Sequence, residues 1–416
     1  MTIANPKKLI LPAFLGLLLA IPRASIFAEF EAEKGWSGHL FPSFIIATAT
    51  VKPAEKDESD DTILGDQQGL LGITIDAEED EQKIKVTITC DAIMEPSVFT
   101  GTLPQSGETY TVNPKIKYKY DQLAKRSQTG PITVTFKVET GDNEAEEKAE
   151  TITLCSVNDC PYSVAKDGKW QSVRYMYAAY VNEQHPFVDK ILREALDTEV
   201  VDSFTGYQTK NPTEVYRQAY ALWLALSNRD VRYSSITKCV AISETVGSQH
   251  VRLIDESINN AQANCVDGSV LLASLLRKVG IEPFLVHVPG HCYLAFYLDE
   301  KGQELTALET TMIGSEMEGD AVSVTGLEDV IDEEDQDNNA WKTFAAAIAT
   351  GTANLKKYQK NFQDPNDHNY QLISVAAARK SGVLPIGFQS NQKFVEAPLS
   401  QEDATEEGKE ESTSNK

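Results

Sequence analysis

The segment NCVDGSVLLASLLRKVGIEPFLVHVPGHCYLAFYL, residues 264–298, decides the fold of the second half of this 416-residue chain. Apolar residues recur at helical spacing from Val266 to Val279, and Gly280 ends the pattern. Two apolar runs with strand character follow and are separated by a Pro-Gly break. The segment therefore predicts one helix followed by two strands.

The predicted helix begins with a cysteine. Asn264 is a good N-cap, and Asp267 at the third helical position can return a hydrogen bond, which places Cys265 in the first turn. Backbone N–H groups and the positive end of the helix dipole favour a thiolate there, as a nucleophile requires. The alternative is a small buried residue that happens to start a helix.

A histidine and a carboxylate follow on the next strands. Strand alternation puts His291 on one face with Tyr293, Ala295 and Tyr297. The turn DEKGQ leads into ELTALE, which runs back antiparallel and ends in Glu309. The strand register, uncertain by one residue, decides whether His291 and Glu309 share a face. A base beside a thiol, oriented by an acid, is the arrangement that nucleophilic acyl transfer requires.

Residues 211–312 resemble the transglutaminase-like branch of the papain-like cysteine enzymes. The likeness lies in the order of NCVDGSVLLASLLRKVGIEPFLV, GHCYLAFYL and LTALETT. It implies Cys265 as nucleophile, His291 as general base and acid, and Glu309 as the group that orients the imidazole. The family usually has Asp-Pro where this chain has Glu309-Thr310, so the third role is matched less closely.

The resemblance also implies an oxyanion site and a substrate class. The backbone N–H of Cys265 would contribute, together with a side-chain donor for which Gln262 and Gln249 are both candidates. His250 either lines the approach or is a structural histidine. The substrate would be an amide in a peptide, a protein or cell-wall material, with water favoured over an amine as acceptor. No cofactor is implied.

Two neighbours of His291 have other expected roles. Cys292 should point to the opposite face of the strand, into the core. A metal site built from His287, His291 and Cys292 is conceivable, but alternation would scatter these ligands, so no metal is expected.

The first half has a different pattern. Short alternating runs rich in Thr and Val predict strands at 72–76, 83–90, 98–103, 131–139 and 150–157. We expect an α+β protein, with an antiparallel β-sandwich of roughly immunoglobulin type over 29–160 and a transglutaminase-like domain over 170–390.

Helices are also predicted outside the central segment. NPTEVYRQAYALWLALSNRD begins with the cap candidate Asn211 and a proline at the first helical position. Further helices are expected at 340–358 and at 370–382, with an acidic insertion over 315–339 that is interpreted as solvated linker. The acidic tail, 391–416, is expected to be disordered.

Charge and the amino terminus limit the partners. The formal net charge is −24, which repels nucleic acid and anionic membrane surfaces. Lys7 and Lys8 precede a short apolar run, which predicts a signal peptide over 1–28 and an exported, periplasmic or extracellular protein. An uncleaved anchor is the alternative; no later segment is predicted to span a membrane.

The six cysteines and the three candidate catalytic residues leave three functional hypotheses. Export permits disulfides among the six cysteines, and Cys155 and Cys160 either close a small loop or are buried thiols. The first hypothesis is an amide-cleaving or acyl-transferring enzyme, and the second an inactive binding or scaffold protein with the same fold. A purely structural role would require Cys265 to be oxidised. All three polar residues that the catalytic site would need are present, which favours the enzyme.

Overall fold

The computed structural model describes residues 29–52, 60–141, 144–166, 168–235, 240–241, 243–364, 367–387 and 392–397. The predicted signal peptide and most of the acidic tail lie outside these residues, as does Cys239. The fold is mixed α+β, with several separate sheets. In the described part of the chain, no helix combines the length and apolarity needed to cross a membrane.

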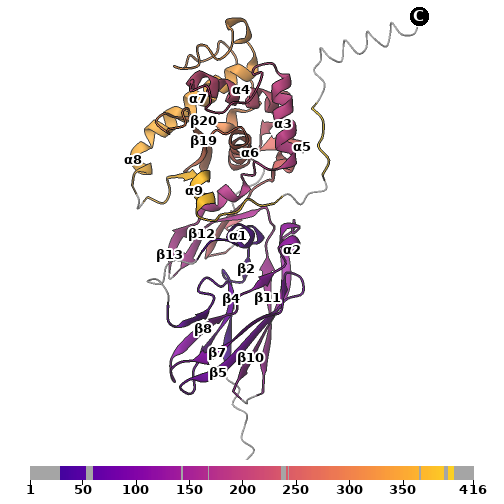
Figure 1. Cartoon of the computed structure of the whole chain (residues 1–416), viewed down its shortest axis with the longest axis vertical. Helices are drawn as coiled ribbons and strands as arrows, with labels where there is room; N and C mark the ends of the chain where they lie inside the picture. Colours follow the sequence, from indigo (N-terminus) through magenta and orange to yellow (C-terminus); the bar gives the residue numbers. More distant parts are fainter. Residues whose placement is uncertain are drawn as a thin grey trace, which may run out of the picture.

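Two sheets form the first half of the chain, in the lower part of Figure 1. All five predicted strands are confirmed, with bounds within a few residues of those expected. One sheet has the order β1 (Phe30–Lys34), β4 (Leu71–Asp76), β8 (Thr109–Asn113), β3 (Ile63–Gly65). The other has the order β2 (His39–Leu40), β11 (Glu146–Leu154), β10 (Gly130–Thr140), β5 (Gln82–Thr89), β7 (Ser97–Leu103).

These two sheets share one hydrophobic core. Ile73 of β4 and Val112 of β8 are buried in the same cluster as Val86 of β5 and Phe136 of β10. The pairings are antiparallel except for the short β2 and β3, which pair parallel with β11 and β8. Smaller elements complete this half: α1 (Pro42–Ala47), the pair β6 (Met94–Glu95) and β9 (Lys117–Tyr118), and α2 (Tyr120–Ala124).

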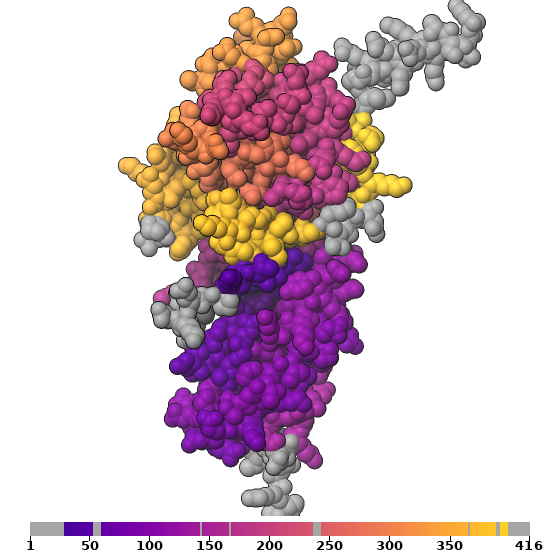
Figure 2. Space-filling model, in the orientation of Figure 1, coloured from indigo at the N-terminus to yellow at the C-terminus, as the bar shows by residue number. Residues whose placement is uncertain are grey.

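A third sheet connects the two halves. Its order is β13 (Lys169–Ser172), β12 (Asp159–Lys166), β16 (Val246–His250), β15 (Val240–Ala241). Strand β12 follows directly on the first two sheets, yet it pairs antiparallel with β16, far along the chain. Figure 2 shows the two halves stacked along the long axis, with the yellow residues around α9 between them.

Helix α6 lies at the centre of the second half, in the main hydrophobic core. Leu272 and Leu276 of α6 are buried there with Trp223 of α4. The predicted cap Asn211 is confirmed, because its side chain accepts a hydrogen bond from the Thr213 N–H. The elements of this region are η2 (Arg174–Tyr180), α3 (Pro186–Asp197), α4 (Pro212–Asn228), β14 (Arg232–Tyr233), α5 (Ile254–Asn259), β17 (Gln262–Ala263) and α6 (Cys265–Lys278).

A four-stranded sheet packs against α6. Its order is β20 (Leu305–Leu308), β19 (His291–Tyr297), β18 (Pro283–Val288), β21 (Gln371–Ser374), with antiparallel neighbours. The two predicted strands and the antiparallel return are thus confirmed. Helix α7 (Asn339–Lys357) lies on β20 so closely that a Cβ at Gly351 would come within 2.7 Å of the Ala307 backbone. Helices α8 (Gln359–Phe362) and α9 (Val375–Lys380) follow α7 and β21.

Three expectations for the C-terminal part require correction. The helix predicted at 370–382 is strand β21 followed by α9, because the Ser374 side chain caps the helix by accepting from the Ala377 N–H. The acidic insertion is not simply solvated: Leu327 and Val330 are buried in the main core. Residues 392–397 of the tail dock on the protein, where the Arg229 guanidinium lies 4.4 Å from the centre of the Phe394 ring.

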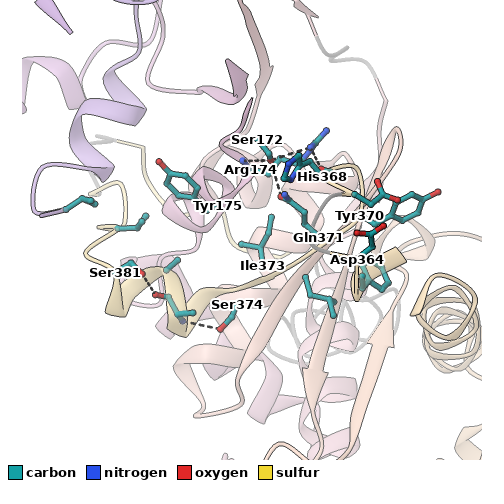
Figure 3. A pocket seen from close by; sticks show the side chains of 17 residues that line it. Ser172, Arg174, Tyr175, Asp364, His368, Tyr370, Gln371, Ile373, Ser374 and Ser381 are labelled. Carbon is teal, nitrogen blue, oxygen red and sulfur yellow. Dashed lines mark hydrogen bonds between the residues drawn. The ribbon is translucent and has the colours of Figure 1, made fainter. Parts of the chain in front are cut away.

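One cavity of about 660 Å³ lies beside β21, and its other walls include α9, the start of η2 and residues of the chain between α8 and β21. Figure 3 shows Ile373 at its centre, Arg174 and His368 at one end, and Ser381 at the other.

Candidate active site

The predicted capping box holds Cys265 at the first position of α6. The Asn264 side chain accepts from the Val266 and Asp267 N–H groups, at 2.8 and 2.9 Å. The Asp267 carboxylate accepts from the Asn264 N–H at 3.0 Å. Cys265 is half-buried and carries a free thiol. The local sequence thus presents the sulfur at the amino end of a buried helix, where backbone dipoles favour negative charge.

Arg252 completes this helix start, which sequence reasoning missed. Asp267 is 0% exposed, and its two oxygens accept from the Arg252 backbone N–H at 2.8 Å and from its Nη1 at 2.7 Å. Because a buried carboxylate is costly unless it is paired and hydrogen-bonded, Arg252 is the residue that permits Asp267 in the capping box.

The end of β20 is held against the first turn of α6. The Cys265 carbonyl accepts from the Ser269 hydroxyl at 2.6 Å and from the Thr310 hydroxyl at 3.4 Å. Gly268 permits this approach, since a Cβ there would lie 3.3 Å from Thr310 Cβ. The contact places Glu309, which precedes Thr310, near the sulfur.

His291 and Glu309 face each other across the ends of their strands. His291 Nε2 lies 2.8 Å from Glu309 Oε2. The Cys265 thiol lies close enough to the same ring to raise its pKa. The structure therefore brings the three predicted residues together, and their catalytic roles stay predictions.

The surroundings favour a protonated imidazole. Hydrogen bonds to Cys265 and then to Glu309 raise the pKa of His291 to about 10, against the opposing effect of burial. Burial raises the pKa of Glu309, but the hydrogen bond and charge of His291 and the bonds from Thr311 outweigh it, so the net shift is downward. Both shifts favour an imidazolium–carboxylate pair at neutral pH.

Thr311 orients the carboxylate, and sequence reasoning missed it. Glu309 is 6% exposed, and its Oε1 accepts from the Thr311 N–H at 3.2 Å and from its hydroxyl at 2.6 Å. Thr311 lies in η3 (Thr310–Met312), which begins directly after Glu309. One oxygen is thus held by the chain, and the other faces His291. The second threonine of LETT was the available signal.

Tyr233 is a further neighbour that the motifs did not reveal. It lies on β14, which pairs parallel with β17 so that Tyr233 is opposite Ala263. Its side chain is 43% exposed. Burial, followed by the nearby Cys265 and Glu309, raises the pKa of its hydroxyl. Tyr233 therefore places an aromatic hydroxyl at the solvent side of the cysteine.

The two glutamine candidates lie in different environments. Gln262 is half-buried on β17, opposite Arg232. Gln249 is 8% exposed on β16, and its Oε1 lies 3.3 Å from the Tyr177 hydroxyl. Neither placement decides between them as an oxyanion donor.

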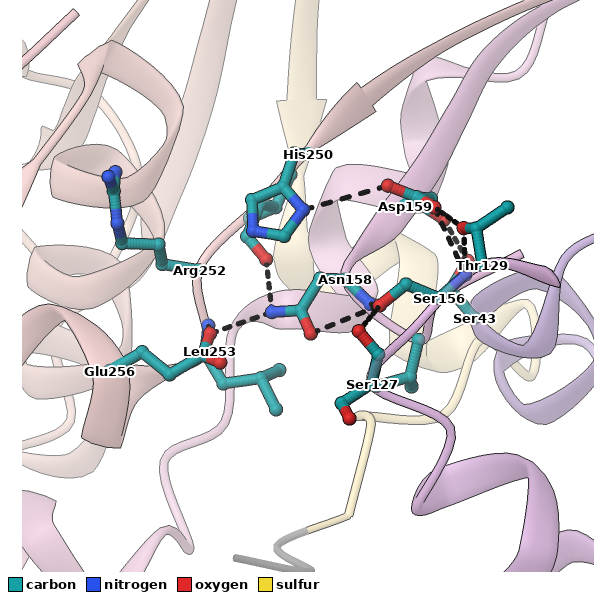
Figure 4. A network of polar contacts seen from close by, with 12 residues as sticks. Ser43, Ser127, Thr129, Ser156, Asn158, Asp159, His250, Arg252, Leu253 and Glu256 are labelled. Carbon is teal, nitrogen blue, oxygen red and sulfur yellow. Dashed lines mark hydrogen bonds and ion pairs between the residues drawn. The ribbon is translucent and has the colours of Figure 1, made fainter. Parts of the chain in front are cut away.

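His250 belongs to a polar network at the junction of the two halves (Figure 4). Its Nδ1 lies 3.6 Å from Asp159 Oδ1, and this contact raises its pKa. The neighbouring Asn158 donates to the Val251 carbonyl at 3.0 Å and to Glu256 at 2.7 Å. The structure thus places His250 in this network, and a role in the approach to the site stays a prediction.

The other cysteines that the structure describes are all buried free thiols: Cys90, Cys155, Cys160 and Cys292. Cys155 and Cys160 are buried free thiols, so no disulfide closes the loop between them. Cys292 is 0% exposed and lies in the main core, as expected. His287 is buried and stacks on Tyr177, with ring centres 5.6 Å apart. Among the described residues, no three His, Cys, Asp or Glu side chains are grouped closely enough to hold a metal ion.

Comparison with known proteins does not place the chain in a family. No family model matches the sequence, and no curated protein matches it significantly.

Proposed function

We propose that this protein is an exported cysteine enzyme that cleaves or transfers acyl groups at amide bonds, with Cys265 as the nucleophile. The observation that supports this most directly is the position of one imidazole, His291, between a thiol at a helix start and a buried carboxylate. A transglutaminase-like fold for the second half and an immunoglobulin-type sandwich for the first half belong to the same proposal.

The proposed reaction follows from the roles of the three side chains. The Cys265 thiolate attacks the amide carbonyl carbon, and the backbone N–H of Cys265 stabilises the oxyanion. The His291 imidazolium donates its proton to the leaving amine, and a thioester remains on the sulfur. Water, deprotonated by His291, then attacks the thioester carbon, so that the acid is released and the thiolate–imidazolium pair is restored. Glu309 and Thr311 keep the ring in position throughout.

An acylation experiment tests this proposal without knowledge of the natural substrate. p-Nitrophenyl acetate should give a burst of p-nitrophenolate and an acetyl thioester that peptide mapping assigns to Cys265. Cys265→Ala should abolish the burst. His291→Ala should slow it by about 10²-fold or more, the usual contribution of a general base.

His250 offers a matched control, since the His250 and His291 side chains are 37% and 30% exposed and each lies beside a carboxylate. His250→Ala should leave the burst unchanged. A burst that survives Cys265→Ala, or equal rates in wild type and His291→Ala, would contradict the proposal. Such results would favour the second hypothesis, a binding or scaffold protein.

A further inference from the structure

The cavity beside β21 follows the edge of a sheet. Strand β21 is the last strand of the order β20-β19-β18-β21, and within the part of the chain that the structure describes it pairs only with β18. Residues 370–374 all line the cavity, although neighbouring residues of a strand point to opposite faces. Because the cavity touches every residue from 370 to 374, it follows β21 along its length. The outer edge of the last strand of the sheet lies beside it.

The opposite edge of the same sheet is covered. Helix α7 lies against β20, where the Thr352 hydroxyl is 3.3 Å from the Ala307 N–H and 3.4 Å from the Ala307 carbonyl oxygen. The Glu309 N–H donates to the Ala347 carbonyl of α7. Proteins usually protect sheet edges, because an unpaired edge is a template for another strand. Here one edge is protected and the other faces a cavity.

The cavity has the size and lining of a binding site. Its volume of about 660 Å³ is within the range of ligand pockets. Leu372 and Tyr175 line it, although they are 38% and 37% exposed. The Ser172 hydroxyl donates a hydrogen bond to Gln371 Oε1 at 3.1 Å. This bond lies at the same end of the cavity as Arg174 (Figure 3). Apolar side chains beside the outer edge of β21 suit an extended peptide better than a compact polar ligand.

The cavity forms a groove along β21, and this groove ends near the proposed reaction centre. Gln371 pairs with His287, whose neighbour Val288 pairs with His291. The start of β21 is therefore two strands from His291, roughly 10 Å at the usual strand spacing. Burial lowers the pKa of His287, and the nearby charges of Arg174 and His291 lower it further. Arg174 lines the cavity, and His291 belongs to the proposed reaction centre. His287 thus lies between the two sites.

We propose that the groove binds an extended polypeptide segment as an additional strand on β21. This inference rests on the proposed function, because it makes the amide substrate a polypeptide and assigns the groove to a segment away from the cleaved bond. Binding would come from main-chain hydrogen bonds to β21, with side chains packing on Leu372 and Tyr175. The lining carries two carboxylates, Asp364 and Asp367, against the one guanidinium of Arg174, and this balance favours basic residues in that segment.

The test uses the full chain with Cys265→Ala, so that binding is measured without turnover. The probe is a fluorescent degenerate peptide library of about twelve residues, rich in Val and Thr and flanked by Lys, which favours extended backbone. A second library carries N-methyl groups on alternate amides and cannot pair as a strand. We expect saturable binding of the first library only, with slower hydrogen exchange at 371–374.

Substitutions on α9 locate the site. Ala377 is exposed and lines the groove, whereas Ala376 is exposed on the same helix but is not part of the lining. Ala377→Trp should fill the groove and weaken binding by about tenfold or more, and Ala376→Trp should not. Equal binding of both libraries, no binding of either, or unchanged hydrogen exchange at 371–374 would overturn the inference. Binding by a protein whose wild type fails the acylation test would instead refute the proposed function.

Discussion

His291 Nε2 lies 2.8 Å from Glu309 Oε2, and the nearby Cys265 thiol also raises the pKa of the same ring. The carboxylate is 6% exposed and its second oxygen is bound by Thr311, so it has little freedom to turn away from the ring. A hydrogen bond between an ionised acid and an imidazolium is stronger than one between neutral groups. The acid thus fixes the orientation of the ring.

Removal of the acid should reduce thiol reactivity. Glu309→Gln keeps the size of the side chain but removes the charge that stabilises the imidazolium. We expect alkylation of Cys265 by iodoacetamide at neutral pH to slow by about tenfold or more, because a neutral ring offers the sulfur no positive partner. Quantitative peptide mapping measures the rate. Glu256→Gln, which changes a carboxylate of the junction network, is the control and should alkylate at the wild-type rate.

Removal of the Thr311 hydroxyl tests orientation separately from charge. Thr311→Val leaves the His291–Glu309 charges in place but deletes the 2.6 Å bond that holds Oε1. We expect a smaller loss of acylation rate than in Glu309→Gln, and Thr311→Ser should restore it. A loss that Ser does not restore would show that packing, and not the hydrogen bond, is the role of Thr311.

The pair should also make stability depend on pH. The pKa of His291 is raised to about 10, so the stability it contributes is complete below its unfolded value near 6.5 and is lost as pH rises toward 10. The pKa of Glu309 is lowered, so its contribution is present above about 4.5 and is lost as pH falls below that value. The difference in unfolding free energy between wild type and Glu309→Gln should therefore be largest between about pH 4.5 and 6.5. Urea unfolding across pH measures it, and a pH-independent difference would contradict the assignment.

The buried Asp267–Arg252 pair should be essential for stability. Asp267→Asn leaves Arg252 without its carboxylate and puts an amide where two oxygens accepted hydrogen bonds. Breaking a buried pair by removing one partner costs about 3–5 kcal/mol. Asp197→Asn removes an exposed pair with Arg193 and should cost less than about 1 kcal/mol. Chemical denaturation of both variants gives the comparison.

Gly351→Ala should destabilise the protein, although alanine is the better helix former. The new methyl group would lie 2.7 Å from the Ala307 backbone and push α7 away from β20. Overpacking should cost about 1–3 kcal/mol and the propensity gain should return about 1 kcal/mol, so we expect a net loss of up to about 2 kcal/mol. Acylation should slow as well, because α7 holds the Glu309 N–H. The opposite change at exposed Ala353 in the same helix, Ala353→Gly, should lower stability without slowing acylation.

Local signals in the sequence predicted the elements around the site better than their surroundings. The capping box depends on Asn264 and Asp267, which are only three residues apart. The strands that begin at Pro283 and His291 depend on short apolar runs. Strand β21 was missed because its apolar residues fit helical and strand spacing alike, and pairing with β18 decides between them. Arg252 was missed because it binds Asp267 from 15 residues earlier in the chain, and no local pattern marks such a partner.

Strand β12 has a consequence for how the protein can be divided. It begins at Asp159, where the first half was expected to end, and supplies β16 with its antiparallel neighbour. A fragment starting near residue 170 would expose the flank of β16 and lose the Asp159 partner of His250. Calorimetry of the intact chain should accordingly show both halves melting in a single cooperative transition, and expression of the second half alone should yield insoluble material.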